Sequence, residues 1–288
     1  MADSAIAQPL TLKCGLKLPN RLAKSAMAEV MSGSNGLPSE LHDRAYDEWG
    51  KANWGMLVTG NVQVDRRYLS TPFDNTLSPE LGNELKASWK SWAHSSTQHG
   101  TPIVMQLSHP GRQSPLGAGK RSIFAKNLAP SALDLDMGPG YIARWSTKLI
   151  FGTPQEMTQA DIDAVVSQFI SASRLAADTG FSGVQLHGAH GYLLSQFLSY
   201  DHNIRTDSYG KTAAGRAKIV VDIVRGIRDV VAEKFCVGIK LNSVDHQSPE
   251  KLNDCIEQIR LIVDAGVDFV EISGGTYGDP KVSTLFGF

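Results

Sequence analysis

The sequence has little cysteine, and that scarcity excludes some classes of protein. Its three cysteines, Cys14, Cys236 and Cys255, lie far apart along a chain of 288 residues. Such spacing excludes a disulfide scaffold and a clustered thiolate site for zinc or iron–sulfur, so we expect a reducing, intracellular location. Because free cysteine is commonly a small buried residue, we expect Cys255 on the buried face of a helix.

Neither sign of charge is in excess, and no apolar run is long. Lysine and arginine number 28 against 29 aspartates and glutamates, a net charge of -1. Nothing here resembles the basic stripe of a nucleic-acid-binding protein or a polybasic membrane-binding tail. The apolar runs are too short to span a bilayer, and the first residues lack the pattern of a secretory leader. We therefore predict a cytoplasmic protein without nucleic-acid or membrane partners.

No glycine-rich dinucleotide fingerprint follows the first expected strand, which leaves a Rossmann domain with little support. From Pro38 onward, amphipathic helical patterns instead alternate with short apolar runs. Strands that are apolar on both faces and alternate with such helices indicate a parallel sheet of β/α units. After a hairpin-like stretch at 12–18, we expect six strands, at residues 21–27, 55–60, 102–107, 184–187, 236–241 and 269–273. Helices are expected at 39–51, 78–99, 158–179, around 220–231 and at 248–265.

Residues 111–154 interrupt this alternation and are rich in glycine, proline and serine. Such a stretch after the third strand indicates a long excursion over the active-site face of a barrel. We therefore predict a (β/α)8 TIM-barrel fold in a single domain covering 1–288. We expect only six of its eight β/α units, because the sequence ends soon after the sixth strand. In barrels that bind a phosphate, the loops after strands seven and eight usually hold it.

The most informative stretch is His187-Gly188-Ala189-His190-Gly191-Tyr192, which directly follows the apolar run 183–186. It places two imidazoles and a phenol where a buried strand gives way to a loop. Imidazole can donate a hydrogen bond to a carbonyl oxygen, a phenol can supply a proton, and a strand end holds both rigidly. The plainer alternative is one core histidine and one loop histidine. A metal site at this pair lacks a third ligand at another strand end.

With these motifs in view, the chain resembles the old yellow enzyme family, the FMN-dependent ene-reductases. The similarity extends over 10–278, and separate motifs follow in the family's order. Besides the histidine motif, they are Leu18-Pro19-Asn20-Arg21 leading into residues 25–28, the run 106–112 (QLSHPGR), and the segment 197–210. The cofactor-binding residues that the resemblance implies are Ser25, Ala26, Met27, Ala28, Gly60, Gln106 and Lys240.

The resemblance also implies what these residues do. Gly60 would let the flavin ring approach the end of the second strand, Gln106 would reach the polar edge of the ring, and Lys240 would lie near N1. The departures from the family concern Ala26, where many members have proline, and Ala28, where a cysteine or threonine is common. Because Ala28 cannot donate a hydrogen bond, a lower reduction potential is expected. The cysteine cluster of the iron–sulfur-containing relatives is missing here.

The implied activity is FMN-dependent reduction, with NADH or NADPH as electron donor, of the C=C bond of an α,β-unsaturated carbonyl compound. His187 and His190 would hold the carbonyl oxygen and stabilise its developing negative charge. Tyr192 would donate a proton to the α-carbon, while the cofactor carries the redox step. The expected partner is a small enone-type molecule.

Several of these residues also have plainer interpretations. Gln106 could satisfy buried backbone groups, and Gly60 could be a packing glycine. A lysine at a strand centre, Lys240, needs an anionic partner. The pair Arg205 and Asp207 is expected to fix a loop. Two aromatic residues of the excursion would either line the substrate mouth or cover the core, namely Tyr141 and Trp145.

Two rival functions stay open. One is a truncated, non-catalytic member of the family that acts as a binding or pathway accessory protein. The other is a flavoprotein that oxidises or isomerises a small metabolite. An open six-stranded sheet also exposes two edges and an apolar face, which predicts a homo-oligomer or poor solubility.

Overall fold

The structure, a computed structural model, describes residues 4–138, 140–243 and 249–275. A parallel sheet forms its centre, with the strand order β11-β10-β9-β6-β4-β3, and a further short strand, β5, pairs with β4. These strands are β3 (Ala23–Lys24), β4 (Met56–Gln63), β5 (Asn75–Thr76), β6 (Ile103–Ser108), β9 (Gly183–Gly188), β10 (Cys236–Asn242) and β11 (Phe269–Ser273). The predicted alternation of helices with six main parallel strands is confirmed.

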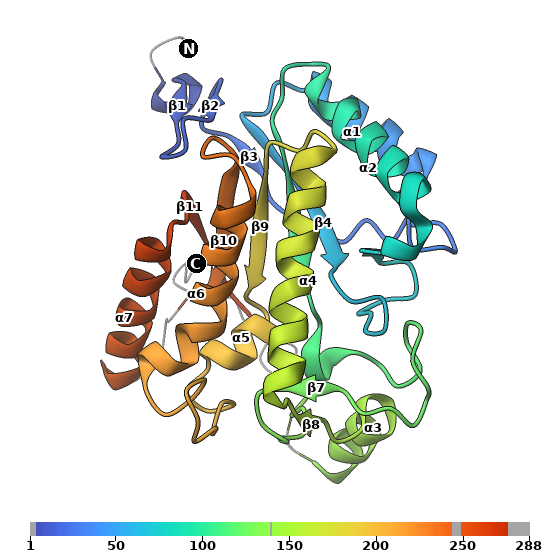
Figure 1. Ribbon diagram of the computed structural model, residues 1–288, viewed down its shortest axis with the longest axis vertical. Helices are drawn as coiled ribbons and strands as arrows, with labels where there is room; N and C mark the ends of the chain where they lie inside the picture. Colours follow the sequence, from blue (N-terminus) through green and yellow to red (C-terminus); the bar gives the residue numbers. More distant parts are fainter. Residues whose placement is uncertain (1–3, 139, 244–248, 276–288) are drawn as a thin grey trace, which may run out of the picture.

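The helices lie along one side of this sheet. Figure 1 shows α4, α6 and α7 next to one another, with α1 and α2 continuing the row beside β4. The long helices are α1 (Glu40–Lys51), α2 (Gly82–Thr97), α4 (Gln159–Asp178), α6 (Ala213–Val230) and α7 (Pro249–Ala265). None of the helices within the described ranges is long and apolar enough to cross a membrane.

Side chains at the helix starts act as the sequence predicts. Thr158 Oγ1 accepts a hydrogen bond from the Asp161 backbone N–H, and the Asp161 carboxylate accepts one from the Thr158 N–H. This capping box satisfies two backbone donors that the first turn of a helix leaves over. The helix expected from Ser78 starts later. A 3-10 turn, Pro79–Leu81, comes first, and α2 begins at Gly82, whose positive φ separates the two.

Two expected strand boundaries are wrong for one structural reason. The first strand, expected at 21–27, is only β3, and the second extends past Gly60 to Gln63. The register of β4 against β6 shifts between Val58 and Asn61, which marks a β-bulge. The ladder between β3 and β4 ends just before the bulge. An extra residue in a strand reverses which face the following side chains point to, so the bulge turns Asn61 toward the inner face of the sheet.

The two faces of the sheet carry different side chains. The outer face and the helices share the larger hydrophobic core, which includes Trp89, Trp92, Phe169, Leu186 and Ile223. The inner face has a smaller apolar cluster near the amino ends of the strands, made of Leu18, Met56, Val58 and Val104 with Leu12, Leu16, Ala26 and Phe269. Further along the same strands the inner face becomes polar, and that polar part holds the candidate site.

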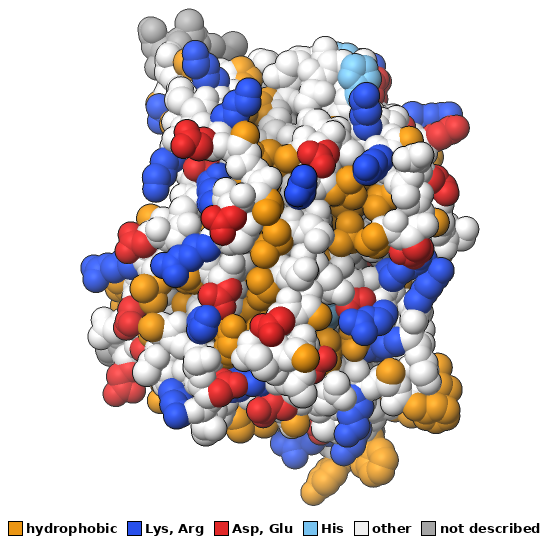
Figure 2. Space-filling view, in the orientation of Figure 1, with side chains coloured by type: hydrophobic (Ala, Val, Ile, Leu, Met, Phe, Trp, Pro, Cys, Tyr) orange, Lys and Arg blue, Asp and Glu red, His pale blue; other side chains and the backbone are white. Residues whose placement is uncertain are grey.

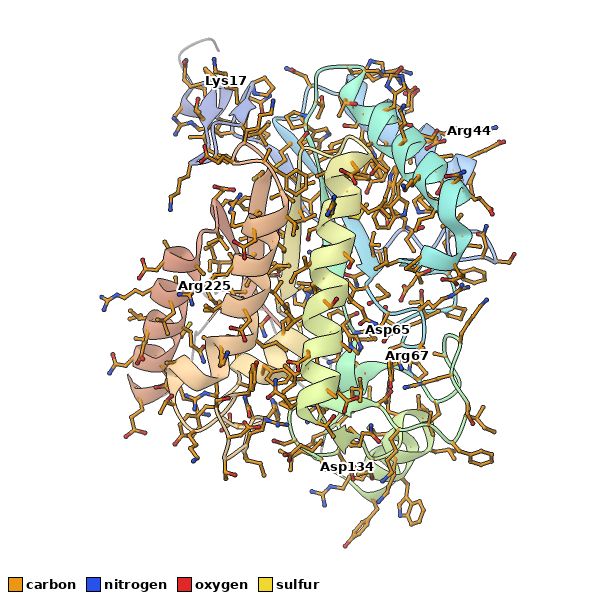
Figure 3. The ribbon with its side chains drawn as sticks, in the orientation of Figure 1. Lys17, Arg44, Asp65, Arg67, Asp134 and Arg225 are labelled. Carbon is orange, nitrogen blue, oxygen red and sulfur yellow. The ribbon has the colours of Figure 1, made fainter. Side chains whose placement is uncertain are left out.

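The first residues close the amino end of the sheet. A 3-10 turn (Ala5–Ala7) precedes the antiparallel hairpin of β1 (Leu10–Thr11) and β2 (Lys17–Leu18), which confirms the hairpin predicted around 12–18. In Figure 1 this hairpin lies at the end of the molecule where the strands begin. In Figure 3, Lys17 marks that end and Asp134, in the excursion, marks the opposite one.

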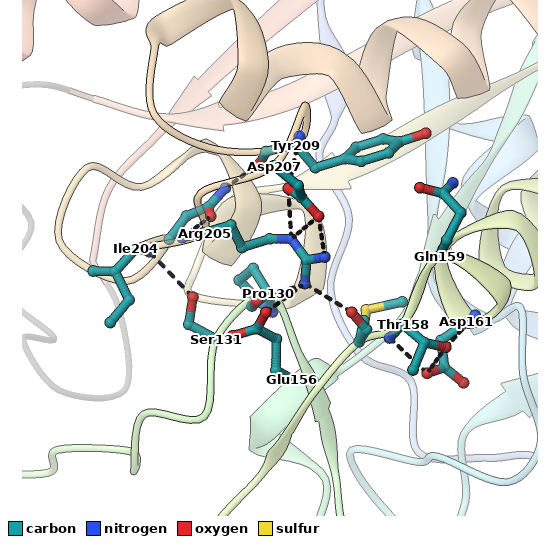
Figure 4. A network of polar contacts seen from close by, with 12 residues as sticks. Pro130, Ser131, Glu156, Thr158, Gln159, Asp161, Ile204, Arg205, Asp207 and Tyr209 are labelled. Carbon is teal, nitrogen blue, oxygen red and sulfur yellow. Dashed lines mark hydrogen bonds and ion pairs between the residues drawn. The ribbon is translucent and has the colours of Figure 1, made fainter.

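The excursion has secondary structure of its own. It contains a 3-10 turn (Gly111–Gln113), the short strand β7 (Leu128–Ala129) and α3 (Tyr141–Phe151), and β7 pairs in parallel with β8 (Gln155–Glu156). Buried Arg205 holds it against the loop before α6 (Figure 4). Its guanidinium donates to the carbonyl oxygens of Pro130 (2.9 Å) and Met157 (2.8 Å) and pairs with Asp207. The expected loop-fixing ion pair is confirmed.

The surface in Figure 2 shows side chains of both charges interspersed, as the small net charge implies. Asp65 and Arg67, adjacent in Figure 3, form one of the ion pairs, at 2.6 Å. Tyr141 and Trp145 point outward from α3 and are 85% and 74% exposed. This exposure contradicts the interpretation that they cover the core, and neither is among the residues that line the cavity of the inner face.

Candidate active site

A cavity of about 430 Å³ opens on the polar part of the inner face, toward the carboxyl ends of the strands. This volume lies within the usual range for small-molecule sites. Its lining residues are Ala26, Ala28, Asn61, Gln106, His187, His190, Tyr192, Lys240, Gly274 and Gly275. Seven of the residues singled out from the sequence therefore come together, from four separate segments of the chain.

The two histidines form a continuous chain of hydrogen bonds. His187 Nδ1 lies 2.9 Å from Asn61 Oδ1, and His187 Nε2 lies 3.0 Å from His190 Nδ1. His190 Nε2 in turn lies 2.8 Å from Ser273 Oγ. The chain of contacts thus crosses the cavity from β4 to β11.

The order of donors along this chain follows from its ends. An amide oxygen only accepts, so the contact with Asn61 requires the proton of neutral His187 on Nδ1. His187 Nε2 then accepts from His190 Nδ1–H, and His190 Nε2 accepts from the Ser273 hydroxyl. In this arrangement every imidazole nitrogen is bonded within the protein, and both rings are neutral.

The surroundings keep both rings neutral. Burial lowers the pKa of His187 well below its ordinary value, and the nearby His190 and Lys240 lower it further. Burial also lowers the pKa of His190, with a further contribution from the charge of Lys240 that Glu271 partly offsets. Both imidazoles therefore act as neutral hydrogen-bonding groups at neutral pH.

The turn that carries this motif has a strained backbone, which hydrogen bonds hold in place. His190 has a φ of 59° and the next residue, Gly191, has 75°. A left-handed conformation is unfavourable for a residue with a Cβ and is held only where the surroundings impose it. Here Asn242 Oδ1 accepts from the His190 N–H (2.9 Å), and Gln113 Nε2 donates to its carbonyl oxygen (3.1 Å).

Tyr192 lies beside the histidines at the start of α5 (Leu193–Leu198). Its ring centroid is 4.6 Å from that of His187, in an edge-to-face arrangement. The side chain is buried and lines the cavity, so the phenol and the imidazole pair border the same space. This juxtaposition is the one expected from the spacing of the motif.

A second network of polar side chains connects Gln106 to Lys240, both of which line the cavity. Gln106 Nε2 donates to Gln185 Oε1, and Gln185 Nε2 donates to Glu271 Oε2, both at 2.7 Å. Lys240 Nζ lies 3.0 Å from Glu271 Oε1 and donates to Ser25 Oγ at 3.0 Å. Although burial favours the protonated form, the hydrogen bonds from Ser25, Gln185 and Lys240 lower the pKa of Glu271. Glu271 is thus the anionic partner that a buried lysine requires.

Three residues expected at the cofactor do not line the cavity. Ser25 contributes indirectly, through its bond to Lys240, while Met27 is 62% exposed. Gly60 lies inside β4 rather than at its end, and its N–H donates to Glu29 Oε1 at 2.7 Å. A Cβ there would overlap the Glu29 carboxylate and lie 2.5 Å from the Met27 carbonyl oxygen. The expectation that Gly60 makes room for a ring is therefore corrected: it makes room for the protein's own chain.

Asn61, Glu271 and Ser273 belong to the site but were not predicted from the sequence. A glycine inside a strand pattern often marks a bulge, so Gly60 was a signal that the next side chain is re-aimed. A glutamate and a serine two residues apart on the last strand point to the same face, as His187 and Gln185 do on theirs. These polar residues at strand ends were a second signal.

This geometry defines an α/β barrel enzyme site at the carboxyl ends of parallel strands, and the comparisons with known proteins identify the family. The model of the NADH:flavin oxidoreductase / NADH oxidase family matches residues 5–281, and the chain belongs to that family. The resemblance to the old yellow enzymes is thus confirmed.

Two fungal relatives cover nearly the whole chain. It is 53% identical to the NADH-dependent flavin oxidoreductase iliE of Neonectria sp. (strain DH2), over 98% of this chain and 37% of that protein. It is 50% identical to the NADH-dependent flavin oxidoreductase iccE of Talaromyces variabilis, over 98% of this chain and 69% of that protein. The chain therefore spans little more than a third of the first relative.

Solved structures confirm the fold. The old yellow enzyme homologue from Zymomonas mobilis superposes with a TM-score of 0.80 at 19% identity, covering 96% of this chain and 78% of that one. A 2-naphthoyl-CoA reductase complex gives a TM-score of 0.83 at 21% identity, covering 97% of this chain and 42% of that one. The fold is thus of the predicted TIM-barrel type.

Family membership supports FMN as the cofactor and a reduced nicotinamide nucleotide as electron donor. The cavity fits the flavin ring in its chemistry. Ala26 and Ala28 give it a small-residue wall, while Gln106 and Lys240 supply an amide and an ammonium group. A planar heteroaromatic ring needs this combination of an open apolar wall and a few convergent polar groups.

Proposed function

We propose that this chain is an FMN-dependent oxidoreductase of the ene-reductase type, which uses NADH or NADPH to reduce the activated C=C bond of an α,β-unsaturated carbonyl compound. The observation that carries the proposal is the convergence of His187, His190 and Tyr192 on one cavity with Gln106 and Lys240. Family membership supports the redox class, and the arrangement of donors supports the substrate class.

Ala26, Ala28, Gln106 and Lys240 would hold the flavin, and when bound FMN supplies the hydride that the reduction requires. Lys240 pairs with Glu271 and lines the cavity, so its ammonium group is placed to stabilise negative charge on a bound ring. The remaining chemistry belongs to side chains of this protein: holding the substrate oxygen and delivering a proton.

The hydrogen-bond chain defines how the substrate oxygen is held. A carbonyl that enters the cavity replaces His187 Nε2 as the acceptor of the His190 Nδ1 proton. His187 becomes a second donor only when its proton moves to Nε2, and the Asn61 amide then has to present Nδ2 to Nδ1. Two preorganised donors at the oxygen would stabilise the charge that develops there.

Tyr192 supplies the proton. Its phenol borders the same cavity as the histidine pair, so it is available to protonate the carbon next to the carbonyl group. A general acid in this position typically contributes about 10²- to 10⁴-fold to a rate.

The test uses protein reconstituted with excess FMN under anaerobic conditions. We expect NADH or NADPH to bleach the flavin absorption band and 2-cyclohexenone to restore it, with cyclohexanone as product. In Tyr192→Phe the bleaching is kept and the restoration is about 10²-fold slower or worse. Tyr141→Phe, at an exposed phenol of α3, is the matched control and leaves both steps unchanged.

The same experiment separates the rival functions. A protein that binds no flavin supports the accessory role. A flavin that is bleached by a hydroxyl substrate, and whose absorption an enone does not restore, supports oxidation of a small metabolite instead. Restoration at the normal rate in Tyr192→Phe would contradict the assigned proton donor.

We also infer a single domain over 1–288 that works in the cytoplasm, binds small molecules rather than nucleic acid, and associates with itself. The interspersed charges support the absence of a nucleic-acid partner. Self-association is supported by β11, which ends the described sheet and exposes Ile272. Light scattering on the purified chain tests it, and a monodisperse monomer would contradict it.

A further inference from the structure

Three metal-ligating groups meet at the amino end of the sheet, on the side away from the candidate active site. They are Cys14 in the turn of the β1–β2 hairpin, Cys236 at the start of β10, and Asp268 just before β11. Their ligand atoms all lie within 4.8 Å of one another. The wide sequence spacing had excluded a thiolate cluster, and the fold overturns that expectation by bringing two of the three cysteines together.

The hairpin places Cys14 by ordinary packing. Its turn is closed by a hydrogen bond from Gly15 N to Leu12 O (2.8 Å), and Gly15 has the positive φ (88°) that such a turn needs. Leu12 and Leu16 pack against the inner apolar cluster, which holds the hairpin against the sheet. Cys14 is half-buried, so a solvated ion has a path to the site.

The other two groups are fixed by the sheet. Cys236 is fully buried, and its backbone N–H donates to Ser182 O at 3.0 Å. Asp268 Oδ2 accepts from the Val237 N–H (2.7 Å) and from Arg228 Nη2 (2.6 Å), which leaves Oδ1 to offer to a cation. The supporting hydrogen bonds orient the carboxylate, as the partners of metal ligands commonly do.

We propose that Cys14, Cys236 and Asp268 form a site for Zn²⁺ or a similar soft divalent cation, with water as the fourth ligand. Thiolate sulfur selects such ions over Mg²⁺ and Ca²⁺, and three protein ligands plus water complete a tetrahedron. Binding releases the two thiol protons to solvent. The ion would tie the hairpin to the first turns of β10 and β11.

The charges of the cluster favour a divalent ion. Two thiolates and one carboxylate carry three negative charges, and Arg228 supplies one positive charge at Asp268. A divalent cation neutralises the remainder, so the buried site has no net charge when it is filled. Buried charge is tolerated only when it is compensated in this way.

The test uses the whole chain, reduced with a phosphine, stripped of metal and titrated with Co²⁺ and then Zn²⁺. We expect one Co²⁺ per chain, with the thiolate-to-cobalt charge-transfer and visible d–d bands of a tetrahedral site, and displacement of the Co²⁺ by Zn²⁺. Cys14→Ala is expected to weaken binding about 100-fold or more, because it removes a ligand. Cys255→Ala, at a half-buried cysteine of α7 outside the cluster, is the matched control and binds normally.

A second readout guards against loss of folding in the variants. Zn²⁺ raises the melting temperature of the wild-type chain and of Cys255→Ala, but leaves that of Cys14→Ala unchanged, since an ion that binds only the folded state stabilises it. Co²⁺ bands that persist in Cys14→Ala would overturn the proposal. Reduced wild-type protein that gives no Co²⁺ bands would also overturn it. This holds equally if Cys14 and Cys236 are found as a disulfide before reduction.

Discussion

The substitution Asn61→Asp tests the hydrogen-bond chain that keeps the two active-site histidines neutral. The amide oxygen of Asn61 lies 2.9 Å from His187 Nδ1. Aspartate has nearly the same shape and keeps an oxygen at this position, but it adds a negative charge. We expect the variant to raise the pKa of His187 above that of the wild type, so that this ring becomes protonated at higher pH.

The magnitude follows from the geometry. Two opposite unit charges about 4 Å apart attract by about 4 kcal/mol at an effective dielectric constant of about 20. Asn61 is half-buried, so loss of hydration by the new carboxylate removes part of this gain. A net effect of about 2 kcal/mol shifts the protonation equilibrium of His187 about 30-fold.

The assay is ¹⁵N NMR of the apoprotein labelled at its 8 histidines, with His187 assigned through His187→Gln. In the wild type, His187 gives one protonated and one unprotonated ring nitrogen throughout the range near neutrality. In Asn61→Asp the two resonances converge, as in an imidazolium, at a higher pH. Asn61→Leu removes the acceptor without adding charge, and its ring stays neutral. Identical titrations of wild type and Asn61→Asp would refute the hydrogen-bond chain.

Three further predictions concern stability. Arg205→Ala leaves the carbonyl groups that it bridges without their donor, so urea unfolding should show that the free energy of unfolding falls by about 3 kcal/mol. Arg225→Ala, at an exposed arginine, is the control and should change it by no more than about 0.5 kcal/mol. Equal effects of the two substitutions would contradict the bridging role. Burial lowers the pKa of His109 to about 4, so the unfolded chain takes up its proton first as the pH falls below 6.5. From pH 7 to pH 5 this costs about 2 kcal/mol, part of which His109→Gln should abolish; an unchanged pH dependence in that variant would count against it. Gly60→Ala forces a methyl group into the Glu29 carboxylate, so thermal unfolding should show a loss of stability of about 1–3 kcal/mol. An unchanged stability would contradict the close contact between Gly60 and Glu29.

Much of the fold follows from hydrophobic periodicity. The helix that starts at Thr158 has apolar residues at helical spacing behind a capping box, and the structure gives α4 with the same start. Strands such as β9 are buried on both faces because helices cover one side and the barrel interior lies on the other. The extent of β3 did not follow, because its pairing ends at the β4 bulge, which is a property of another segment.

The candidate site likewise contains some residues that could be predicted from the sequence and others that could not. His187, His190 and Tyr192 were found because they lie within six residues of sequence and carry recognisable chemistry. Asn61, Glu271 and Ser273 were missed because their roles arise from register: Asn61 lies opposite Gln106 on β6, which pairs with β9 on its other side. The grouping of Cys14 with Cys236 likewise depends on where the hairpin packs. Contacts between distant segments depend on the three-dimensional arrangement, so local signals such as Gly60 indicate that a side chain is re-aimed but not which residue it contacts.

The most direct test of the central claim is an FMN titration of the whole chain, followed by the quenching of flavin fluorescence. The claim is that the polar inner face around Gln106 and Lys240 is a flavin site. It predicts one FMN per chain, affinity about tenfold weaker or worse in Gln106→Leu through loss of a buried hydrogen bond, and unchanged affinity in the exposed control Gln98→Leu. Absence of binding by the wild type, or equal affinity in all three proteins, would contradict the claim.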